Sequence, residues 1–423
     1  MSGGTLPVNG PRASFGRPGG TGRTSSDEFG RRSLMAAPPP ADNWFVSASS
    51  STRPAGPPDL GALLAFAVER GASDLHLKVA ARPIVRINGS LTQIPGCEVL
   101  QAEDTERMSA ELLDGHIAKS AEFAGCGETD LSHARDGLGR FRVNIFRQRG
   151  SISIVMRVVP FKVLSVEDLQ LPPVVGRLAD EERGIILVTG TTGSGKSTTL
   201  AAMIDRINSR SHKHVVTIED PIEMLHIDRG SLINQREVGL DTESFSSALR
   251  RVLRQDPDVI MIGEIRDLTT METALSAAET GHLVLSTMHT LDATETVNRA
   301  IGFFPLHQQQ QVRSMLAGTL RGIISQRLVR TADGGARVPA CEVLVSTGRA
   351  KDMIKNADET ARLSEVIREG DFYGMQTFDQ SLFDHVTAGR VTLAAAMEAA
   401  SSPHDFKLML DAGASRRESA QYS

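Results

Sequence analysis

Hydrophobic and polar positions change their period several times along this 423-residue chain. The stretch "DLGALLAFAVERG" (59–71) has apolar residues at helical spacing and a glycine placed to end the helix. The next stretch, "SDLHLKV", alternates apolar and polar residues and predicts a strand. It is followed by "RPIVRINGSLTQI", in which Asn88-Gly89 predicts a type I′ hairpin turn. An ordered region is therefore expected to begin near residue 59.

A second group of elements follows a helical interval at about 102–122. "GRFRVNIFRQRGSISIVMRVV" (139–159) alternates through two strands that meet at Arg149-Gly150. We interpret 59–160 as a small α+β domain. Its last strands are rich in arginine, namely Arg140, Arg142, Arg147, Arg149 and Arg157.

The pattern changes again over 161–345. "GIILVTG", "HVVTIED", "VIMIGEI" and "HLVLSTMH" are short apolar runs, typical of parallel strands with both faces covered. Helical stretches lie between them, and Thr269-x-x-Glu272 predicts a capping box that opens one helix, which Gly281 would end. This region is predicted to be an α/β domain. The remainder is predicted to be a helical region (346–410) and a frayed end (411–423).

The first 58 residues are rich in glycine and proline and poor in large apolar residues. Such a segment cannot offset the entropy of ordering itself, so 1–58 is predicted to be a disordered tail. Within it, "NWFV" (43–46) holds the single tryptophan of the chain. That stretch is either a docking peptide or an incidental apolar spot.

The composition of the chain argues against several classes of protein. The net charge of −5 argues against a generally nucleic-acid-binding surface. The three cysteines lie far apart, without a C-x-x-C pair, so neither a zinc cluster nor a disulfide framework is indicated. There is no run of 18 apolar residues to span a bilayer and no signal-peptide pattern. We expect a cytoplasmic protein whose membrane association, if any, is peripheral.

A phosphate-binding loop is predicted by "GTTGSGKST", which follows the apolar "IILVT" and precedes a helical stretch. It matches G-x-x-x-x-G-K-[ST] in the strand–loop–helix context that this pattern requires. Loop N–H groups would bind phosphate oxygens, the lysine would contact the β- and γ-phosphates, and the serine would bind magnesium. No guanine-recognition motif in the usual order is present, which favours ATP. The predicted nucleotide-binding residues are Gly190, Thr191, Thr192, Gly193, Ser194, Gly195, Lys196, Ser197 and Thr198.

Two further strand ends carry carboxylates. "VTIEDPIE" has Glu219, Asp220 and Glu223 at its end, and the apolar run of "DPDVIMIGEIRD" ends at Glu264. Ligands bind at the carboxyl ends of strands in open α/β sheets, so both ends are expected to converge on the loop. We assign Glu264 to the metal shell and Glu219 to polarising the attacking water, with a simple polar strand exit as the alternative.

Two histidines bracket the next apolar run, "TGHLVLSTMHT". His289 lies near the exit of this strand, where a γ-phosphate sensor would sit, and is a catalytic candidate. A histidine beside a strand also often has a purely structural role, and His282 fits that interpretation better.

Together these stretches resemble a known family. In order and spacing, "GTTGSGKST", "TIEDPIE", "DPDVIMIGEIRD" and "TGHLVLSTMHT" resemble the Walker A, Asp box, Walker B and His box of secretion-superfamily ATPases. "GASDLHL", "RFRVNIFRQRGS", "CEVLVST" and "GMQTFDQSL" resemble the pilus-retraction branch, the PilT family. The resemblance covers about residues 59–410. It implies a RecA-like P-loop ATPase domain, preceded by a PAS-like α+β domain and followed by a helical region.

The family resemblance also implies a function. It implies a homohexameric motor that hydrolyses ATP with Mg²⁺ and powers type IV pilus retraction, peripheral to the inner membrane. Its partners would be the inner-membrane platform protein and pilin, with no nucleic acid expected. Each N-terminal domain would send arginines to the nucleotide of the next subunit. Arg142 and Arg157 are the candidates, with Arg140 third, although a solvated strand face explains most of these arginines equally well.

One stretch departs from the family pattern. "GRAKDMIKNADET" (348–360) keeps only the outline of an arginine-containing stretch associated with retraction. Alternatives therefore stay open: a pilus-assembly or type II secretion ATPase, a DNA translocase of the same superfamily, or a nucleotide-dependent switch with little turnover.

Overall fold

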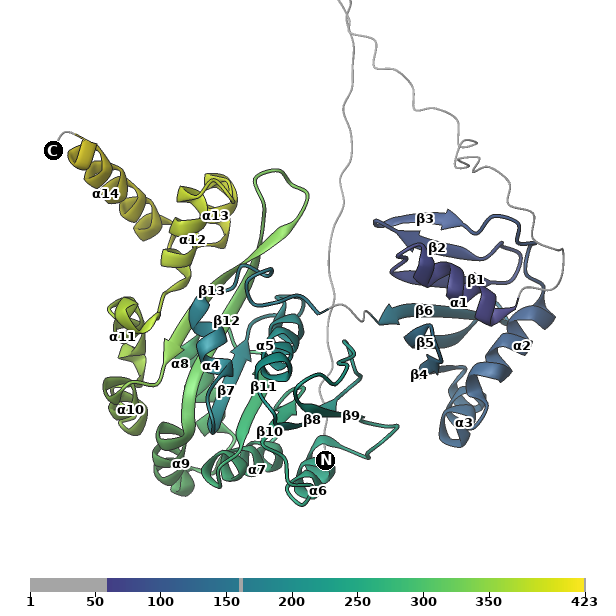
Figure 1. Cartoon of the computed structure of the whole chain (residues 1–423), viewed down its shortest axis with the longest axis horizontal. Coiled ribbons are helices and arrows are strands. Elements are labelled where there is room, and N and C mark those ends of the chain that lie inside the picture. Colours follow the sequence, from purple (N-terminus) through teal and green to yellow (C-terminus); the bar gives the residue numbers. More distant parts are fainter. Residues whose placement is uncertain (1–58, 160–162, 422–423) are drawn as a thin grey trace, which may run out of the picture. The chain divides into compact units, whose positions relative to one another are not determined.

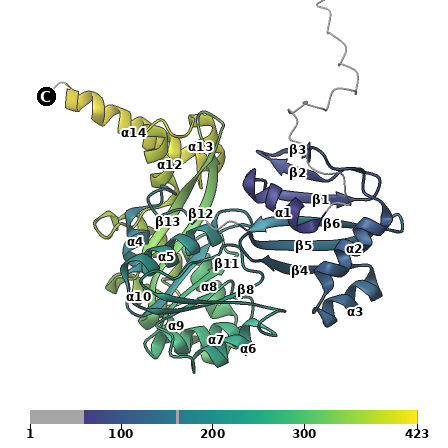
Figure 2. The same ribbon diagram turned by 45° about the vertical axis from the view of Figure 1, so that its right-hand side comes forward.

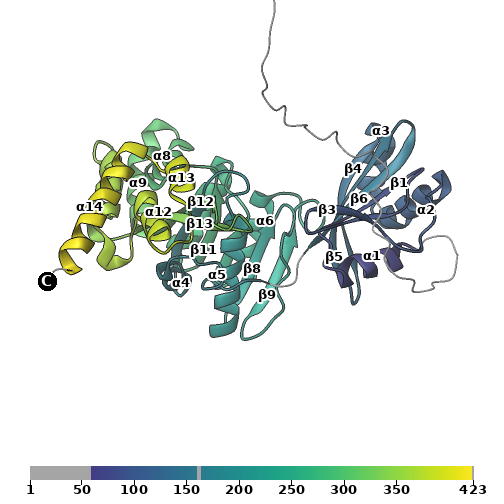
Figure 3. The ribbon, with the colours of Figure 1, turned by 90° about the horizontal axis from the view of Figure 1, so that it is seen from above.

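In the part of the chain that the structure describes, the strands form two separate sheets, of six and seven strands. The structure, a computed structural model, describes residues 59–159 and 163–421, with side chains up to residue 412. The predicted tail and its "NWFV" stretch lie outside the described residues. Figure 1 labels the elements in chain order, and Figure 3 shows them from above.

The first sheet is antiparallel and has the order β3-β2-β1-β6-β5-β4. At the turn between β2 and β3, Asn88 and Gly89 both have positive φ, as the predicted type I′ turn requires. The elements of this part are α1 (Leu60–Glu69), β1 (Asp74–Lys78), β2 (Ile84–Ile87), β3 (Ser90–Gln93), α2 (Ala102–Leu113), α3 (Ile117–Cys126), β4 (Glu128–Arg135), β5 (Gly139–Gln148) and β6 (Ser151–Val159).

One face of this sheet is apolar and the other is polar. Alternate residues such as Leu75, Phe141 and Met156 are buried in one cluster with the apolar residues of α1 and α2. Figure 2 shows α1 and α2 against the strands. Because side chains alternate across a strand, the residues between them, including Arg142 and Arg157, lie on the opposite face.

The second sheet has the order β13-β12-β7-β11-β10-β8-β9, and all neighbouring strands are parallel except β12 and β13. Its elements are α4 (Pro173–Ala179), β7 (Gly184–Thr189), α5 (Lys196–Arg210), β8 (His214–Glu219), β9 (Leu232–Glu237), α6 (Phe245–Val252), β10 (Val259–Ile262), α7 (Leu268–Glu279), β11 (Leu283–Met288), α8 (Ala293–Gly302), α9 (Leu306–Thr319), β12 (Leu320–Arg330) and β13 (Arg337–Val345).

Helices cover both faces of this sheet, which explains its continuous apolar strands. Ile185 and Leu187 of β7 join a core with α6 to α9, whereas Ile186 and Val188 join a core with α4 and α5. The inner strands are also aligned in register. Ile262 of β10 lies opposite Ile218 of β8 and Ser286 of β11. The carboxyl ends of β8, β10 and β11 therefore meet along one edge of the sheet.

The last part of the described chain is helical. It comprises α10 (Gly348–Lys355), α11 (Leu363–Arg368), α12 (Phe378–Thr387), α13 (Leu393–Ala399) and α14 (Pro403–Gln421), with short 3₁₀ turns at Thr360–Arg362 and Asp371–Tyr373. Leu382, Ala396 and Phe406 of α12 to α14 form a small core with residues of the β12–β13 hairpin. The helical backbone of α14 extends into the stretch expected to be frayed.

The predicted capping box of α7 is wrong. The helix begins at Leu268, and Asp267 is its N-cap, with Oδ1 accepting from Thr270 N at 2.9 Å. Asp267 caps the helix because it stands two residues before Thr269, where the backbone is still extended. Thr269 is thus inside the first turn. Within the described residues, no helix is long and apolar enough to cross a membrane.

The position of this cap can be tested by stability. Asp267→Ala should lower the free energy of unfolding by about 1 kcal/mol, because a backbone N–H loses its acceptor. Thr269→Ala, the matched control two residues away, should change it by less than about 0.5 kcal/mol. Urea titration followed by circular dichroism measures both. Equal losses, or a larger loss for Thr269→Ala, would contradict the assignment.

Candidate nucleotide-binding site

The glycine-rich loop joins β7 to α5 in the conformation that a phosphate cradle needs. Gly190, Gly193 and Gly195 all have positive φ, which glycine adopts without strain. At Gly190 a Cβ would lie 2.5 Å from the Gln326 carbonyl oxygen, so the backbones approach too closely for any side chain. Gly195 is the N-cap of α5. The N-terminus of a 15-residue helix, with its partial positive charge, therefore opens at the end of this loop.

Lys196 is held against the loop. Its Nζ donates to the carbonyl oxygens of Gly190 at 2.8 Å and Thr191 at 2.9 Å, and the residue is 8% exposed. Burial lowers the pKa of the Lys196 amine, and the carboxylates of Glu264 and Glu223 partly offset that effect. Both acids line the same pocket as the lysine.

Glu219 is a buried carboxylate at the end of β8. Its Oε1 accepts from Thr217 Oγ1 at 2.8 Å and from Gln235 Nε2 at 3.0 Å. Oε2 faces the backbone N–H of Glu223 at 3.4 Å. Burial raises the pKa of the Glu219 carboxyl, while these three donors act in the opposite direction. A carboxylate with a raised pKa is suited to accept a proton near neutral pH.

Glu264 and His289, predicted from separate stretches, are in contact. His289 Nε2 lies 3.2 Å from Glu264 Oε2, and Arg266 pairs with Oε1 of the same carboxylate. The strand tip behind them is fixed by Thr287, whose Oγ1 donates to the Gly263 carbonyl at 2.7 Å. His282 lies at the other end of β11, where its Nδ1 contacts the Ala277 carbonyl oxygen, which is a structural role.

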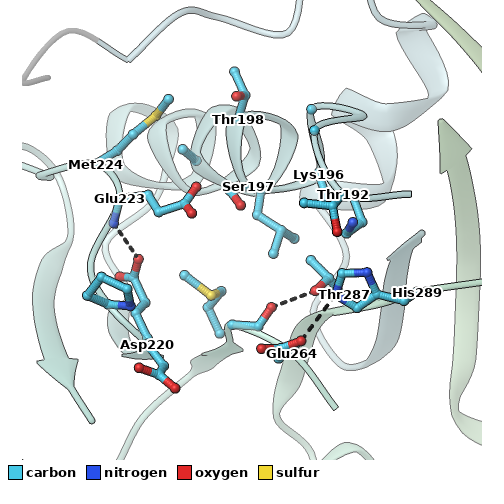
Figure 4. A pocket seen from close by; sticks show the side chains of 18 of the residues that line it. Thr192, Lys196, Ser197, Thr198, Asp220, Glu223, Met224, Glu264, Thr287 and His289 are labelled. Carbon is cyan, nitrogen blue, oxygen red and sulfur yellow. Dashed lines mark hydrogen bonds and ion pairs between the residues drawn. The ribbon is translucent and has the colours of Figure 1, made fainter. Parts of the chain in front are cut away.

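These residues line one pocket of about 590 Å³, a size suited to a nucleotide. Figure 4 shows Lys196 and Ser197 at the start of α5, with Glu264 and His289 across the pocket from them. Of the predicted site, the lining includes Thr192, Gly193, Gly195, Lys196, Ser197, Thr198, Glu219, Glu264 and His289. Gly190, Thr191 and Ser194 shape the loop without lining the pocket.

The lining also includes residues for which no role was assigned from the sequence. Glu223 extends into the pocket on the side of α5 and Met224 lies beside it (Figure 4). Leu328 and Arg337 come from β12 and β13, far along the chain. Glu223 was visible in the "EDPIE" stretch, but its role depends on the turn after Pro221. Leu328 and Arg337 gave no sequence signal.

The residues present fit magnesium bound together with a nucleotide. No cluster of three or more His, Cys, Asp or Glu side chains that could hold a metal exists in the described part of the chain. Magnesium needs no such cluster, because it commonly binds through one or two protein oxygens together with phosphates and waters. Ser197 and Glu264 both line the pocket and carry oxygen atoms of that kind.

The candidate arginines do not lie in this pocket within the subunit. Arg142 and Arg157 are directly opposite each other on β5 and β6 and share the polar face of the first sheet. Arg157 Nε donates to Asp74 at 2.9 Å, while two thirds of its side chain stays exposed. Arg140 pairs with Glu237 at 2.8 Å. Arg147 instead stacks over Phe123.

Gly190 tests the geometry of the loop. Gly190→Ala should weaken the binding of Mg²⁺ with an ATP analogue by at least about tenfold, since the new methyl group would displace the loop from Gln326. Gly334→Ala is the control, because Gly334 also has positive φ but open space around it. Isothermal titration calorimetry measures both. Unchanged affinity in Gly190→Ala would contradict the described loop.

Comparison with known proteins is consistent with this site. The family model "Type II/IV secretion system protein" matches residues 133–393. The chain is 43% identical to the type IV pilus retraction ATPase PilT of Pseudomonas aeruginosa, over 82% of this chain and all of that protein. It is 40% identical to the type IV pilus ATPase PilU of the same organism, over 83% of this chain and 91% of that protein.

A solved structure agrees in fold. The crystal structure of the pilus retraction motor PilT with bound ADP shares 43% identity and a TM-score of 0.73, over 80% of this chain and 96% of that one. Identity at this level over most of both chains, with all four sequence boxes on one pocket, establishes the relationship. The chain belongs to the PilT family of type II/IV secretion system ATPases.

Proposed function

We propose that this protein is a homohexameric motor that hydrolyses ATP to power type IV pilus retraction and twitching motility. The observation that carries the proposal is the convergence of Lys196 and Ser197 with Glu219 and Glu264 on a single pocket. The similarity to a pilus retraction ATPase over 82% of this chain supports the direction of movement. A switch without turnover would have no need of a buried carboxylate of raised pKa beside the phosphate cradle.

The geometry suggests how the residues would act. The loop N–H groups and Lys196 bind the β- and γ-phosphates. Ser197 and Glu264 would hold magnesium, which supplies charge neutralisation at those phosphates. Glu219 accepts a proton from the attacking water while the oxygen of that water forms a bond to the γ-phosphorus. The bond from that phosphorus to the bridging oxygen breaks, and ADP leaves with the electron pair.

We further propose the organisation suggested by the family. Residues 59–160 would be a PAS-like domain, 161–345 a RecA-like ATPase domain, 346–410 a helical region, and 1–58 and 411–423 tails. The two separate sheets support the division near residue 160. The protein would act in the cytoplasm, peripherally at the inner membrane, with the platform protein and pilin as partners.

An experiment in cells can test whether the motor retracts or assembles pili. In a deletion strain, a Glu219→Gln allele should bind ATP but leave surface pili extended and abolish twitching, because the water keeps its proton. Electron microscopy of pili and a subsurface motility assay measure this, with the wild-type allele as control. Restored motility would contradict the role of Glu219. Loss of surface pili would instead indicate an assembly ATPase.

Mixed rings can test whether Arg157 acts on the nucleotide of its own subunit or on that of the neighbouring subunit. Arg157→Ala and Glu219→Gln rings should each lose ATPase activity, an arginine being worth roughly 10³–10⁵-fold in such reactions. If Arg157 acts on the neighbouring subunit, rings reassembled from an equal mixture should regain activity. About one interface in four then joins an intact Glu219 to an intact Arg157, since each position is correctly filled half of the time.

The mixed rings distinguish an arginine that acts on the neighbouring subunit from one that acts within its own subunit. Arginine acting within its own subunit gives no recovery, because no subunit carries both groups. Arg149→Ala, at an exposed turn of the same sheet, is the matched control and should keep wild-type turnover alone.

A further inference from the structure

A polar patch on β8 and β9 surrounds Glu219. The two strands are paired in parallel, with Thr217 opposite Gln235 and Glu219 opposite Glu237. Residues directly opposite each other, and those two apart on one strand, share a face of the sheet. These four polar side chains therefore lie together on one face. Thr217, Glu219 and Glu237 are all at most 8% exposed, so their polar atoms need partners within the protein.

The Gln235 side chain makes three hydrogen bonds, one to Glu219 and two to the backbone of the segment after β8. Its Nε2 donates to Glu219 Oε1 at 3.0 Å and to the Met224 carbonyl at 2.9 Å. Its Oε1 accepts from His226 N at 2.8 Å. One amide thus joins the carboxylate at the end of β8 to the backbone of the segment that follows it. Glu237 adds to this by accepting from Ile222 N at 3.0 Å.

The two oxygens of Glu219 consequently differ. Oε1 receives two well-formed side-chain hydrogen bonds, from Thr217 and Gln235. Oε2 has one long contact, from Glu223 N at 3.4 Å, which is near the limit for a hydrogen bond. Oε1 is therefore occupied, and Oε2 is the oxygen with capacity to accept a proton. Glu219 itself lines the nucleotide pocket.

We propose that Gln235 is a positioning residue for ATP hydrolysis, whose amide, with the Thr217 hydroxyl, fixes Oε1 of Glu219 so that Oε2 meets the attacking water. The same amide holds the backbone of Met224 and His226, which directly follow Glu223 of the pocket lining. The inference rests on the proposed hydrolytic function and adds to it a residue whose side chain need not touch the nucleotide.

The sign of the pH effect follows from the charges around Glu219. Burial and the neighbouring Glu223 carboxylate raise the pKa of Glu219, and the donors from Gln235 and Thr217 lower it. The other charged or titratable groups on the pocket lining and on β9 are Lys196, Asp220, His226, Arg236, Glu237, Glu264, Arg266, His289 and Arg337. A base must be ionised, so turnover should fall on the acid side of its pKa. Removing a donor favours the protonated form and should move this fall to higher pH.

The test uses two variants that remove one donor each with little change in size. Gln235→Met and Thr217→Val in the full-length protein should lower kcat at neutral pH by at least about tenfold, as expected for a lost hydrogen bond to a charged group. In both variants, the decrease of kcat on the acid side of the pH profile should move to higher pH, while KM for ATP changes little. Thr217→Ser, which restores the hydroxyl, should restore the wild-type profile. Asn234→Ala is the control on β9, because its side chain contacts His214 instead.

The outcomes separate this inference from the function on which it rests. If Glu219→Gln is inactive but Gln235→Met and Thr217→Val keep the wild-type kcat and pH profile, the positioning role is wrong. A uniform loss of activity at every pH, or failure of Thr217→Ser to rescue, would indicate a merely structural role and also overturn it. If Glu219→Gln itself turns over ATP normally, the proposed catalytic function fails first.

Discussion

The parallel pairing of β7, β11, β10 and β8 is the constraint on which the site depends. These strands are aligned so that their last residues fall along one edge of the sheet. The phosphate loop leaves β7 at that edge, Glu219 ends β8, Glu264 follows β10 and His289 follows β11. No single stretch of sequence contains the site. It exists because apolar strands, buried on both faces, are held in this register by two helical layers.

Burial then determines how the charged groups behave. In a low-dielectric setting the charged form of a group is disfavoured unless hydrogen bonds or opposite charges stabilise it. Here burial lowers the pKa of Lys196 and raises that of Glu219, moving both groups toward neutrality. The bound phosphates would restore a partner for the lysine. For Glu219, the protein places two side-chain donors on Oε1 and only one long backbone contact on Oε2, which keeps the carboxyl ionisable while leaving Oε2 able to accept a proton.

Much of the fold could be predicted from the sequence because local patterns determined it. The helix at 60–69 and the Asn88-Gly89 turn are encoded by period and by residues suited to positive φ. The four sequence motifs predicted the phosphate loop, Glu219 and Glu264, and the structure brings these groups together in one pocket. The first turn of α7 was misassigned, since Asp267 and Thr269 are both good caps and only the backbone distinguishes them.

What could not be predicted depends on contacts between distant segments. Strand β9 has little apolar alternation, so Gln235 gave no sign of its role, which arises from its pairing opposite Thr217. Leu328 and Arg337 reach the pocket only because β12 lies beside β7. Among the arginines, the sequence could not separate Arg147, which stacks over Phe123, from Arg157, which is held by Asp74 and remains exposed.

The central claim is that the loop before Lys196 and the carboxylates at two strand ends enclose one magnesium-bound triphosphate. The most direct measurement is a structure of the assembled protein with Mg²⁺ and a non-hydrolysable ATP analogue. The account predicts Ser197 and Glu264 around the metal and Glu219 Oε2 facing the water in line with the γ-phosphate. A nucleotide bound in the loop with both carboxylates turned away from it would contradict the account.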